Sequence, residues 1–256
     1  MAKVVLTVRV NDVDFYCERR GTGLPLVLIP DGVNDCEHYS AVGDLLSDEF
    51  SVLTFDMRGG TRSMPEKHVK VTPKILAGDV AGIIKALDMA PASIYGCSSG
   101  GQTALAVGKY YPEVAVNLIA HEAALMADTP IPNTGFDFFD ALYKTFGPMC
   151  DGFSPRDVSF VCNWDNWKAF GDDFLRRAEA NTEYWAQYIW ARLIPILIPR
   201  RILRRCRIWS SASGHGRRTG WLMQICLLRS GAGALVRFCR VDIIRRLFAL
   251  MSLWTS

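Results

Sequence analysis

With 256 residues and a net charge of +3, the chain is long enough for one α/β domain with a full core or for two small domains. Half of the residues are apolar, but no run of 18 apolar residues indicates a membrane span and no signal peptide is evident. The eight cysteines lack close pairing and metal-like spacing, which predicts reduced thiols, a cytoplasmic protein and no metal centre.

The first half of the chain alternates strand-like and helix-like segments. Two alternating runs, 4–10 and 13–18, flank Asn11-Asp12 and predict a β-hairpin. Thr72-Pro73 supplies a cap and a first turn for one predicted helix. Continuous apolar runs predict buried strands at 25–30, 51–55, 91–95 and 114–120, and helical spacing predicts helices at 39–46, 72–87 and 102–111. This order predicts a mostly parallel sheet flanked by helices, with sites at the carboxyl ends of the strands.

Residues 95–101, which read YGCSSGG, contain the pattern G-x-S-x-G centred on Ser98. A strand-like run precedes the pattern and a helix-like run follows it, which is the context of a nucleophile elbow. Gly96 and Gly100 fit this interpretation, because larger side chains two residues from the serine would collide in so sharp a turn. The turn would lift the Ser98 hydroxyl above the sheet and direct the positive end of a helix at an oxyanion. The sequence therefore predicts Ser98 as a nucleophile, with a structural elbow as the alternative.

A serine nucleophile needs a base and an acid that orients the base. Glu122 lies just beyond a buried strand and is the candidate acid, with an ordinary surface carboxylate as the alternative. Gly32 and Ser99 are placed to supply the two backbone amides of an oxyanion hole. Asp31 and Asp56 are alternative acids, although the sequence favours a role for both in organising their loops.

Strand signals end after the predicted sixth strand, and helical, aromatic-rich segments follow. Residues 124–190 are therefore predicted to form a helical lid over an apolar pocket. This divides the chain into the N-terminal part of a core at 1–123, the lid at 124–190 and a C-terminal segment at 191–256.

Several segments resemble the fungal zearalenone-hydrolase group of α/β-hydrolases. The resemblance covers about 13–195 and is carried by IPDGVNDC at 29–36, TFDMRGGTRS at 54–63, YGCSSGG at 95–101, Tyr111-Pro112 and His121-Glu122. It implies an α/β-hydrolase fold with a helical lid. It also implies cofactor-independent hydrolysis of an ester or lactone of an apolar, aromatic metabolite, with a macrocyclic resorcylic lactone as the substrate of the family.

The resemblance assigns the same roles to the same residues. Ser98 is the nucleophile, Glu122 is the triad acid, and Gly32 and Ser99 supply the oxyanion amides. Residues 166–172 resemble a lid stretch whose tryptophan contacts substrate, which makes Trp167 a candidate binding residue. The chain departs from the family pattern at Arg58-Gly59-Gly60 and within the lid.

No histidine lies where the resemblance places the triad base, in a segment like L-P-G-x-H-[FY]-P near the C-terminus. His121 adjoins the candidate acid and would point elsewhere, and His215 lies well upstream of the expected position. His38 and His68 lie in the N-terminal half of the chain. We therefore assign no base from the sequence.

The C-terminal segment differs in composition from the rest of the chain. Residues 191–256 contain thirteen arginines, no lysine and one acid, Asp242, so they carry +12, whereas the first 190 residues carry −9. When read one nucleotide earlier, the codons of 238–245 permit the family's histidine segment. The codons of 201–206 then permit K-D-L-E-A-L, which resembles the approach to the next family strand. We therefore predict that the segment from near Pro195 onward is a frameshifted or mis-spliced translation.

Such a segment would leave the last strands and helix of the fold without counterparts, one sheet edge open and Ser98 without a base. Residues 194–209 and 235–254 could still form basic amphipathic helices, so a membrane-surface or nucleic-acid patch is the functional alternative there.

For the whole chain, a non-catalytic small-molecule binder is the alternative to a hydrolase. A dehalogenase or epoxide hydrolase with an aspartate nucleophile is disfavoured by the serine at the elbow. We expect a small-molecule ester or lactone substrate, no cofactor, no metal, no nucleic-acid partner and no membrane span, and a homodimer is left open.

Overall fold

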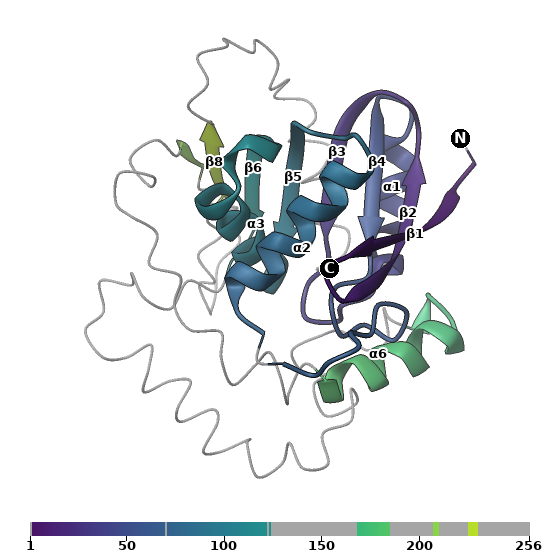
Figure 1. Cartoon of the computed structure of the whole chain (residues 1–256). Helices are drawn as coiled ribbons and strands as arrows, with labels where there is room; N and C mark the ends of the chain where they lie inside the picture. Colours follow the sequence, from purple (N-terminus) through teal and green to yellow (C-terminus); the bar gives the residue numbers. More distant parts are fainter. Residues whose placement is uncertain are drawn as a thin grey trace, which may run out of the picture.

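One β-sheet with helices on both faces forms the centre of the structure (Figure 1). The computed structural model describes residues 2–69, 71–121, 123, 168–184, 207–209 and 225–229. In chain order the described elements are β1 (Val4–Val10), β2 (Val13–Arg20), β3 (Leu24–Ile29), η1 (Cys36–Tyr39), α1 (Ser40–Leu46), β4 (Phe50–Phe55), α2 (Pro73–Ala86), β5 (Ala92–Cys97), α3 (Ser99–Tyr110), η2 (Pro112–Val114), β6 (Ala115–His121), α6 (Asp172–Tyr184), β7 (Arg207–Trp209) and β8 (Ile225–Arg229).

The strand order in the sheet is β1-β2-β4-β3-β5-β6-β8-β7. The central strands β4, β3, β5 and β6 are parallel, whereas β1 and β2 at one edge and β8 and β7 at the other are antiparallel to their neighbours. The predicted α/β fold with parallel central strands and intervening helices is therefore confirmed. In such a sheet, the loops at the carboxyl ends of β3, β4, β5 and β6 lie along the same edge.

The predicted hairpin between β1 and β2 forms with a two-residue turn, because Val10 pairs with Val13 and Asn11 adopts a positive φ of 53°. The central strands are buried on both faces, as their continuous apolar runs predict. In β3, Val27 and Ile29 belong to the larger hydrophobic cluster, while Leu26 and Leu28 belong to the cluster on the opposite face. Because successive side chains of a strand point to opposite faces, each central strand contributes to one hydrophobic core on each face of the sheet.

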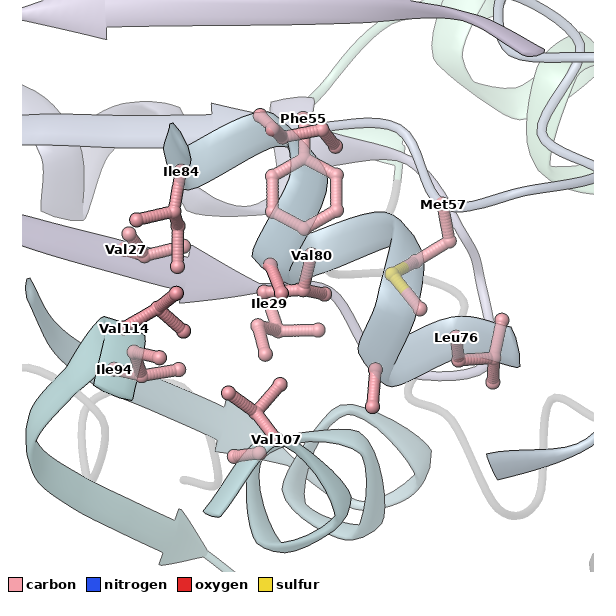
Figure 2. Packing of buried hydrophobic residues seen from close by; sticks show 14 of the residues in the cluster. Val27, Ile29, Phe55, Met57, Leu76, Val80, Ile84, Ile94, Val107 and Val114 are labelled. Carbon is pink, nitrogen blue, oxygen red and sulfur yellow. The ribbon is translucent and has the colours of Figure 1, made fainter. Parts of the chain in front are cut away.

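The larger core lies between the sheet and the helices α2 and α3. Figure 2 shows Val27, Ile29, Phe55 and Ile94 of the strands packed around Val80 and other residues of these helices. Helix α2 begins where the sequence predicts, since the Thr72 hydroxyl oxygen accepts a hydrogen bond of 3.3 Å from the backbone N–H of Ile75. The smaller core packs α1 against the other face of the sheet.

The predicted open edge beside β6 is wrong for the described residues. Strand β8 pairs antiparallel with β6, Leu118 opposite Leu228, and β7 pairs with β8. Residues 207–209 are therefore strand, whereas the sequence allowed a basic amphipathic helix over 194–209. A short apolar run at 225–228 permits this pairing, which gives hydrogen-bond partners to backbone groups of β6 that would otherwise lie at an edge. The remainder of 194–209 and all of 235–254 lie outside the described residues.

A buried ionic cluster joins strand β2 to helix α1. Glu18 and Arg20 are each 1% exposed and form a salt bridge of 2.8 Å. Glu18 also accepts hydrogen bonds from the Lys3 ammonium at 3.0 Å and the Tyr16 hydroxyl at 2.8 Å, and Arg20 donates to Asp44 at 2.7 Å. Burial raises the pKa of Glu18, but the hydrogen bonds from Lys3, Tyr16 and Arg20 outweigh it, so the pKa lies below its ordinary value of 4.5.

We predict that Glu18→Gln lowers the free energy of unfolding by about 2 kcal/mol at neutral pH, because charge-assisted hydrogen bonds are lost. A carboxylate with a lowered pKa stabilises the folded state above pH 4.5, and this contribution disappears as the pH falls through the folded-state pKa. The gap between the two proteins should therefore close in acid, as measured by urea denaturation across pH. Asp14→Asn, on the same strand but with a side chain that is 61% exposed, is the control and should change little. A gap independent of pH would contradict the prediction.

Candidate active site

Ser98 lies at the sharp turn between β5 and α3. Its backbone angles, φ 52° and ψ −118°, are ones that residues with side chains rarely adopt. Its N–H donates to the carbonyl oxygen of His121 at 2.9 Å, and its carbonyl oxygen accepts from the N–H of Gln102 at 3.1 Å. Ser98 is exposed, whereas Ser99 and Gly100 behind it are buried. The predicted order of strand, turn and helix is therefore confirmed, with the serine accessible at the turn.

The glycines on either side of Ser98 are required by lack of space. A Cβ atom on Gly96 would lie 2.1 Å from the carbonyl oxygen of Gly100, and a Cβ atom on Gly100 would lie 2.3 Å from the carbonyl oxygen of Pro30. Both separations are far shorter than van der Waals contact, so the predicted steric reason for these glycines is confirmed. Because Pro30 follows the last residue of β3, the second contact also places the elbow against the loop after β3.

This loop, residues 30–35 and here called the β3 loop, contains a tight turn. The N–H of Asn34 donates to the carbonyl oxygen of Asp31 at 3.0 Å, and the N–H of Val33 donates to the Asp31 carboxylate at 3.0 Å. Gly32 and Val33 therefore occupy the centre of the turn. Since β3 and β5 are neighbours in the sheet, the structure brings the turn with Gly32 and the start of α3 with Ser99 to adjoining strand ends. Two amides that are to bind one oxyanion need this proximity.

The alternative acids Asp31 and Asp56 both hold loop backbone. Asp56 is fully buried, and its carboxylate accepts from the Cys36 N–H at 2.9 Å and from the Arg62 guanidinium at 2.7 and 2.8 Å. Burial raises the pKa of Asp56, and the Arg62 guanidinium acts against this rise. The Asp31 carboxylate lies 3.5 Å from Nδ1 of His38 in addition to its bond within the turn. These contacts favour the loop-organising role over that of a triad acid.

The histidines described by the structure contact aromatic rings. Nδ1 of His121 and the hydroxyl of Tyr95 are 2.8 Å apart and buried, which directs that imidazole toward β5. Ring centroids lie 5.4 Å apart for His38 and Tyr39, 5.5 Å for His68 and Tyr184, and 6.2 Å for His121 and Tyr95. None of these contacts identifies a base for Ser98.

Three residues named by the sequence, Glu122, Trp167 and His215, lie outside the described residues. For Glu122, the neighbouring strand is informative. Strand β6 ends at His121, the residue before Glu122, and Cys97 at the end of β5 pairs with His121. His121, the residue before Glu122, therefore lies next to the elbow, and the role of Glu122 as the acid stays a prediction.

Arg58, where the chain departs from the family pattern, is held by two aspartates. Its guanidinium is 2% exposed and donates to both carboxylate oxygens of Asp79 on α2, at 2.7 and 2.8 Å, and to Asp12 at 2.7 Å. Burial lowers the pKa of Arg58, but these carboxylates outweigh it and raise it above its ordinary value. Arg58 thus ties the loop after β4, residues 56–63 and here called the β4 loop, to α2 and the β1–β2 turn.

Helix α6, within the predicted lid, supplies contacts that the sequence does not predict. Arg177 forms salt bridges with Asp35 and Glu37, and Asn181 hydrogen bonds to backbone groups of the β3 and β4 loops. Both residues lie on one face of the helix, four positions apart. This spacing is the one feature of the sequence that could have indicated the contacts. Polar residues four positions apart, however, are also typical of a helix face that points to solvent.

The described residues include neither a candidate metal site nor a membrane-spanning helix. No group of histidine, cysteine, aspartate or glutamate residues that could hold a metal ion occurs in the part of the chain that the structure describes. Within the same ranges, none of the helices has both the length and the apolar composition that crossing a bilayer requires.

Comparisons with known proteins agree with this geometry. A family model described as alpha/beta hydrolase fold matches residues 25–149. Zearalenone hydrolase from Bionectria ochroleuca is 33% identical over 201 residues, which cover 77% of this chain and 74% of that protein. Zearalenone hydrolase from Cladophialophora bantiana is 33% identical over 194 residues, which cover 72% and 68%.

Among solved structures, the enol-lactonase from Burkholderia xenovorans LB400 aligns with a TM-score of 0.50 and 19% identity, over 73% of this chain and 74% of that one. This likeness shows the fold. The sequence identity to the two hydrolases, over more than two thirds of each, shows the family. The chain therefore belongs to the zearalenone hydrolase-like group of the α/β-hydrolase family.

Proposed function

We propose that Ser98 is the nucleophile of this chain, which by family is an ester or lactone hydrolase. The observation that carries the proposal is the strained, glycine-flanked turn that presents Ser98 at the end of β5 beside the β3 loop. A non-glycine residue with such angles persists only where its surroundings hold it, and strain of this kind gathers at functional sites. Here the surroundings are the two flanking glycines and the hydrogen bond to the carbonyl of His121.

In the proposed reaction, the Ser98 hydroxyl oxygen attacks the substrate carbonyl carbon while its proton passes to a base. The negative charge that develops on the carbonyl oxygen is bound by the N–H groups of Gly32 and Ser99. Collapse of this intermediate breaks the bond to the alcohol oxygen, which leaves with the proton. Water then hydrolyses the acyl-serine and restores the hydroxyl. Glu122 would orient the base and stabilise its charged form.

We propose an ester or lactone of an apolar, aromatic metabolite as the substrate, with a zearalenone-type lactone as the first compound to test. Both of the relatives described above are named zearalenone hydrolase, and each is one third identical to this chain. Trp167 is the proposed substrate contact in the lid. In a lactone the alcohol that leaves stays attached to the acid, so the ring opens and one product forms.

The base is the missing part of the proposed machinery. His38 lies against Asp31, His121 against Tyr95 and His68 against Tyr184. None of these three histidines lies in the family's histidine segment. We therefore propose that this chain has at most residual activity, because its C-terminal segment is read in a shifted frame. An oxyanion hole alone still accelerates acyl transfer by about 10³-fold over water in serine proteases.

A non-catalytic small-molecule binder is the second candidate. The absence of an assigned base favours it, while the strained turn at Ser98 speaks against it, because a binding site has no need of a strained serine. The two candidates differ in what they predict for the Ser98 hydroxyl.

We predict that any turnover of an activated aryl ester by the chain above the buffer rate is lost in Ser98→Ala. The variant removes only the attacking oxygen and leaves the turn and both amides in place. Initial rates with p-nitrophenyl acetate, with Ser93→Ala on β5 as the matched control, test this. Equal rates for the chain and Ser98→Ala, both above the buffer rate, would contradict the proposal.

We further predict that a one-nucleotide insertion near the Pro195 codon creates an active enzyme. The insertion places a histidine codon across the present Asp242 and Ile243 codons, so the restored chain would open zearalenone at least about 10³-fold faster than the present one. The product is measured by liquid chromatography. Changing the new histidine to alanine should abolish the gain. A transcript that encodes 196–256 in an intact frame with no shift, together with an inactive insertion variant, would refute the frame hypothesis.

A further inference from the structure

Helix α6 holds the β3 loop by polar contacts to its backbone. The amide nitrogen of Asn181 donates to the carbonyl oxygen of Val33 at 2.9 Å, and the amide oxygen of Asn181 accepts from the N–H of Thr61 at 2.7 Å. Asn181 is fully buried. One side chain of the lid helix therefore connects the β3 loop with the β4 loop, and both of its polar groups are used.

Arg177, one turn earlier on α6, holds the same loop by charge. Its Nε donates to Oδ2 of Asp35 at 2.6 Å, and its Nη2 donates to Oε2 of Glu37 at 2.5 Å. Asp35 is fully buried, which strengthens the attraction between the charges. The side chain of the preceding residue, Arg176, is 76% exposed and pairs with Asp173 of the same helix.

Apolar packing completes the contact. Val33 forms a small cluster with Phe174 and Ala178 of α6, both fully buried, and this cluster is separate from the two cores on the sheet. Gly59 in the β4 loop has a φ of 87°, and a Cβ atom there would lie 2.0 Å from the Tyr184 ring. The last turn of α6 is therefore fitted closely to the loops at the carboxyl edge of the sheet (Figure 1).

These contacts hold both backbone polar groups of Val33, the residue that follows Gly32. The N–H of Val33 is held by the Asp31 carboxylate, and its carbonyl oxygen is held by Asn181. A donor that is to bind an oxyanion must be held within about 0.5 Å of its working position. Displacements of about 1 Å in a site can cost about 100-fold in rate.

We propose that Asn181 and Arg177 are positioning residues that set the Gly32 amide from the lid helix, acting through Val33 and Asp35. The inference rests on the proposed role of Gly32 as an oxyanion donor. It gives helix α6, which lies within the predicted lid, the task of ordering the β3 loop.

Two substitutions separate this role from general stability. Asn181→Asp keeps an oxygen that accepts from the Thr61 N–H, but it loses the donor to Val33 and places a carboxylate against that carbonyl. Arg177→Gln removes one cation from Asp35, which keeps a salt bridge of 2.8 Å with Arg62, so the loop retains a charged partner. Arg176→Gln, at the adjacent exposed position, is the matched control.

The first measurement is hydrogen exchange on the full chain. Asn181→Asp and Arg177→Gln should each speed exchange of the amides in 31–37 by about tenfold, which corresponds to about 1.4 kcal/mol of lost local stability. Exchange in β5 should stay unchanged, and Arg176→Gln should match the parent chain throughout. Unchanged exchange in 31–37 would overturn the proposal, and equal acceleration in β5 would reveal a merely structural effect and overturn it as well.

The second measurement is steady-state hydrolysis of an aryl ester by whichever chain, present or frame-restored, shows turnover that depends on Ser98. Both variants should lower kcat by at least about tenfold with KM nearly unchanged, because an oxyanion donor acts in the transition state. Unchanged kcat would overturn the positioning role. If neither chain shows turnover dependent on Ser98, the proposed function fails, and the exchange measurement still decides whether α6 orders the β3 loop.

Discussion

The contact between Gly100 and the carbonyl oxygen of Pro30 determines how the candidate site is built. No side chain fits between them, so α3 can begin directly behind Ser98 and against the end of β3. The strained backbone of Ser98 follows from this closeness, since the chain must leave β5 and enter the helix within one residue. A side chain on Gly100 would force the start of α3 away from the end of β3, and a side chain on Gly96 would collide with the first turn of α3.

Buried charges hold the loops around this turn in place. Asp56 and Asp35 bind Arg62, Asp79 binds Arg58, and Arg177 joins the first set from α6. Buried ion pairs contribute little net stability, because burying each charge is costly, but removing one partner leaves an uncompensated charge. The loops are therefore restricted to one arrangement, which suits a site that has to hold backbone donors ready for negative charge.

Much of this structure could be predicted from local sequence. Apolar runs located the central strands to within one or two residues, Thr72-Pro73 located the start of α2, and the spacing of Gly96 and Gly100 around Ser98 located the elbow. Each of these signals depends on neighbouring residues, and so a single sequence contains it.

The contacts made by α6 could not be predicted in this way. Asn181 is 148 residues from Val33, and Arg177 is 142 residues from Asp35, and nothing in either segment names its partner. The pairing of β8 with β6 was missed for a related reason. Its five residues lie in an arginine-rich segment in which the sequence showed no clear strand, and the partner strand ends more than a hundred residues earlier.

The sheet topology places the candidate site away from the edges of the sheet. All four strands that lead into the candidate site lie in the parallel centre, and antiparallel strands cover this centre on both sides. Among the strands that the structure describes, β1 and β7 are outermost, and the backbone of such edge strands can pair with another molecule. Substitutions in β1 or β7 would therefore affect self-association of the protein more than they affect the position of Ser98.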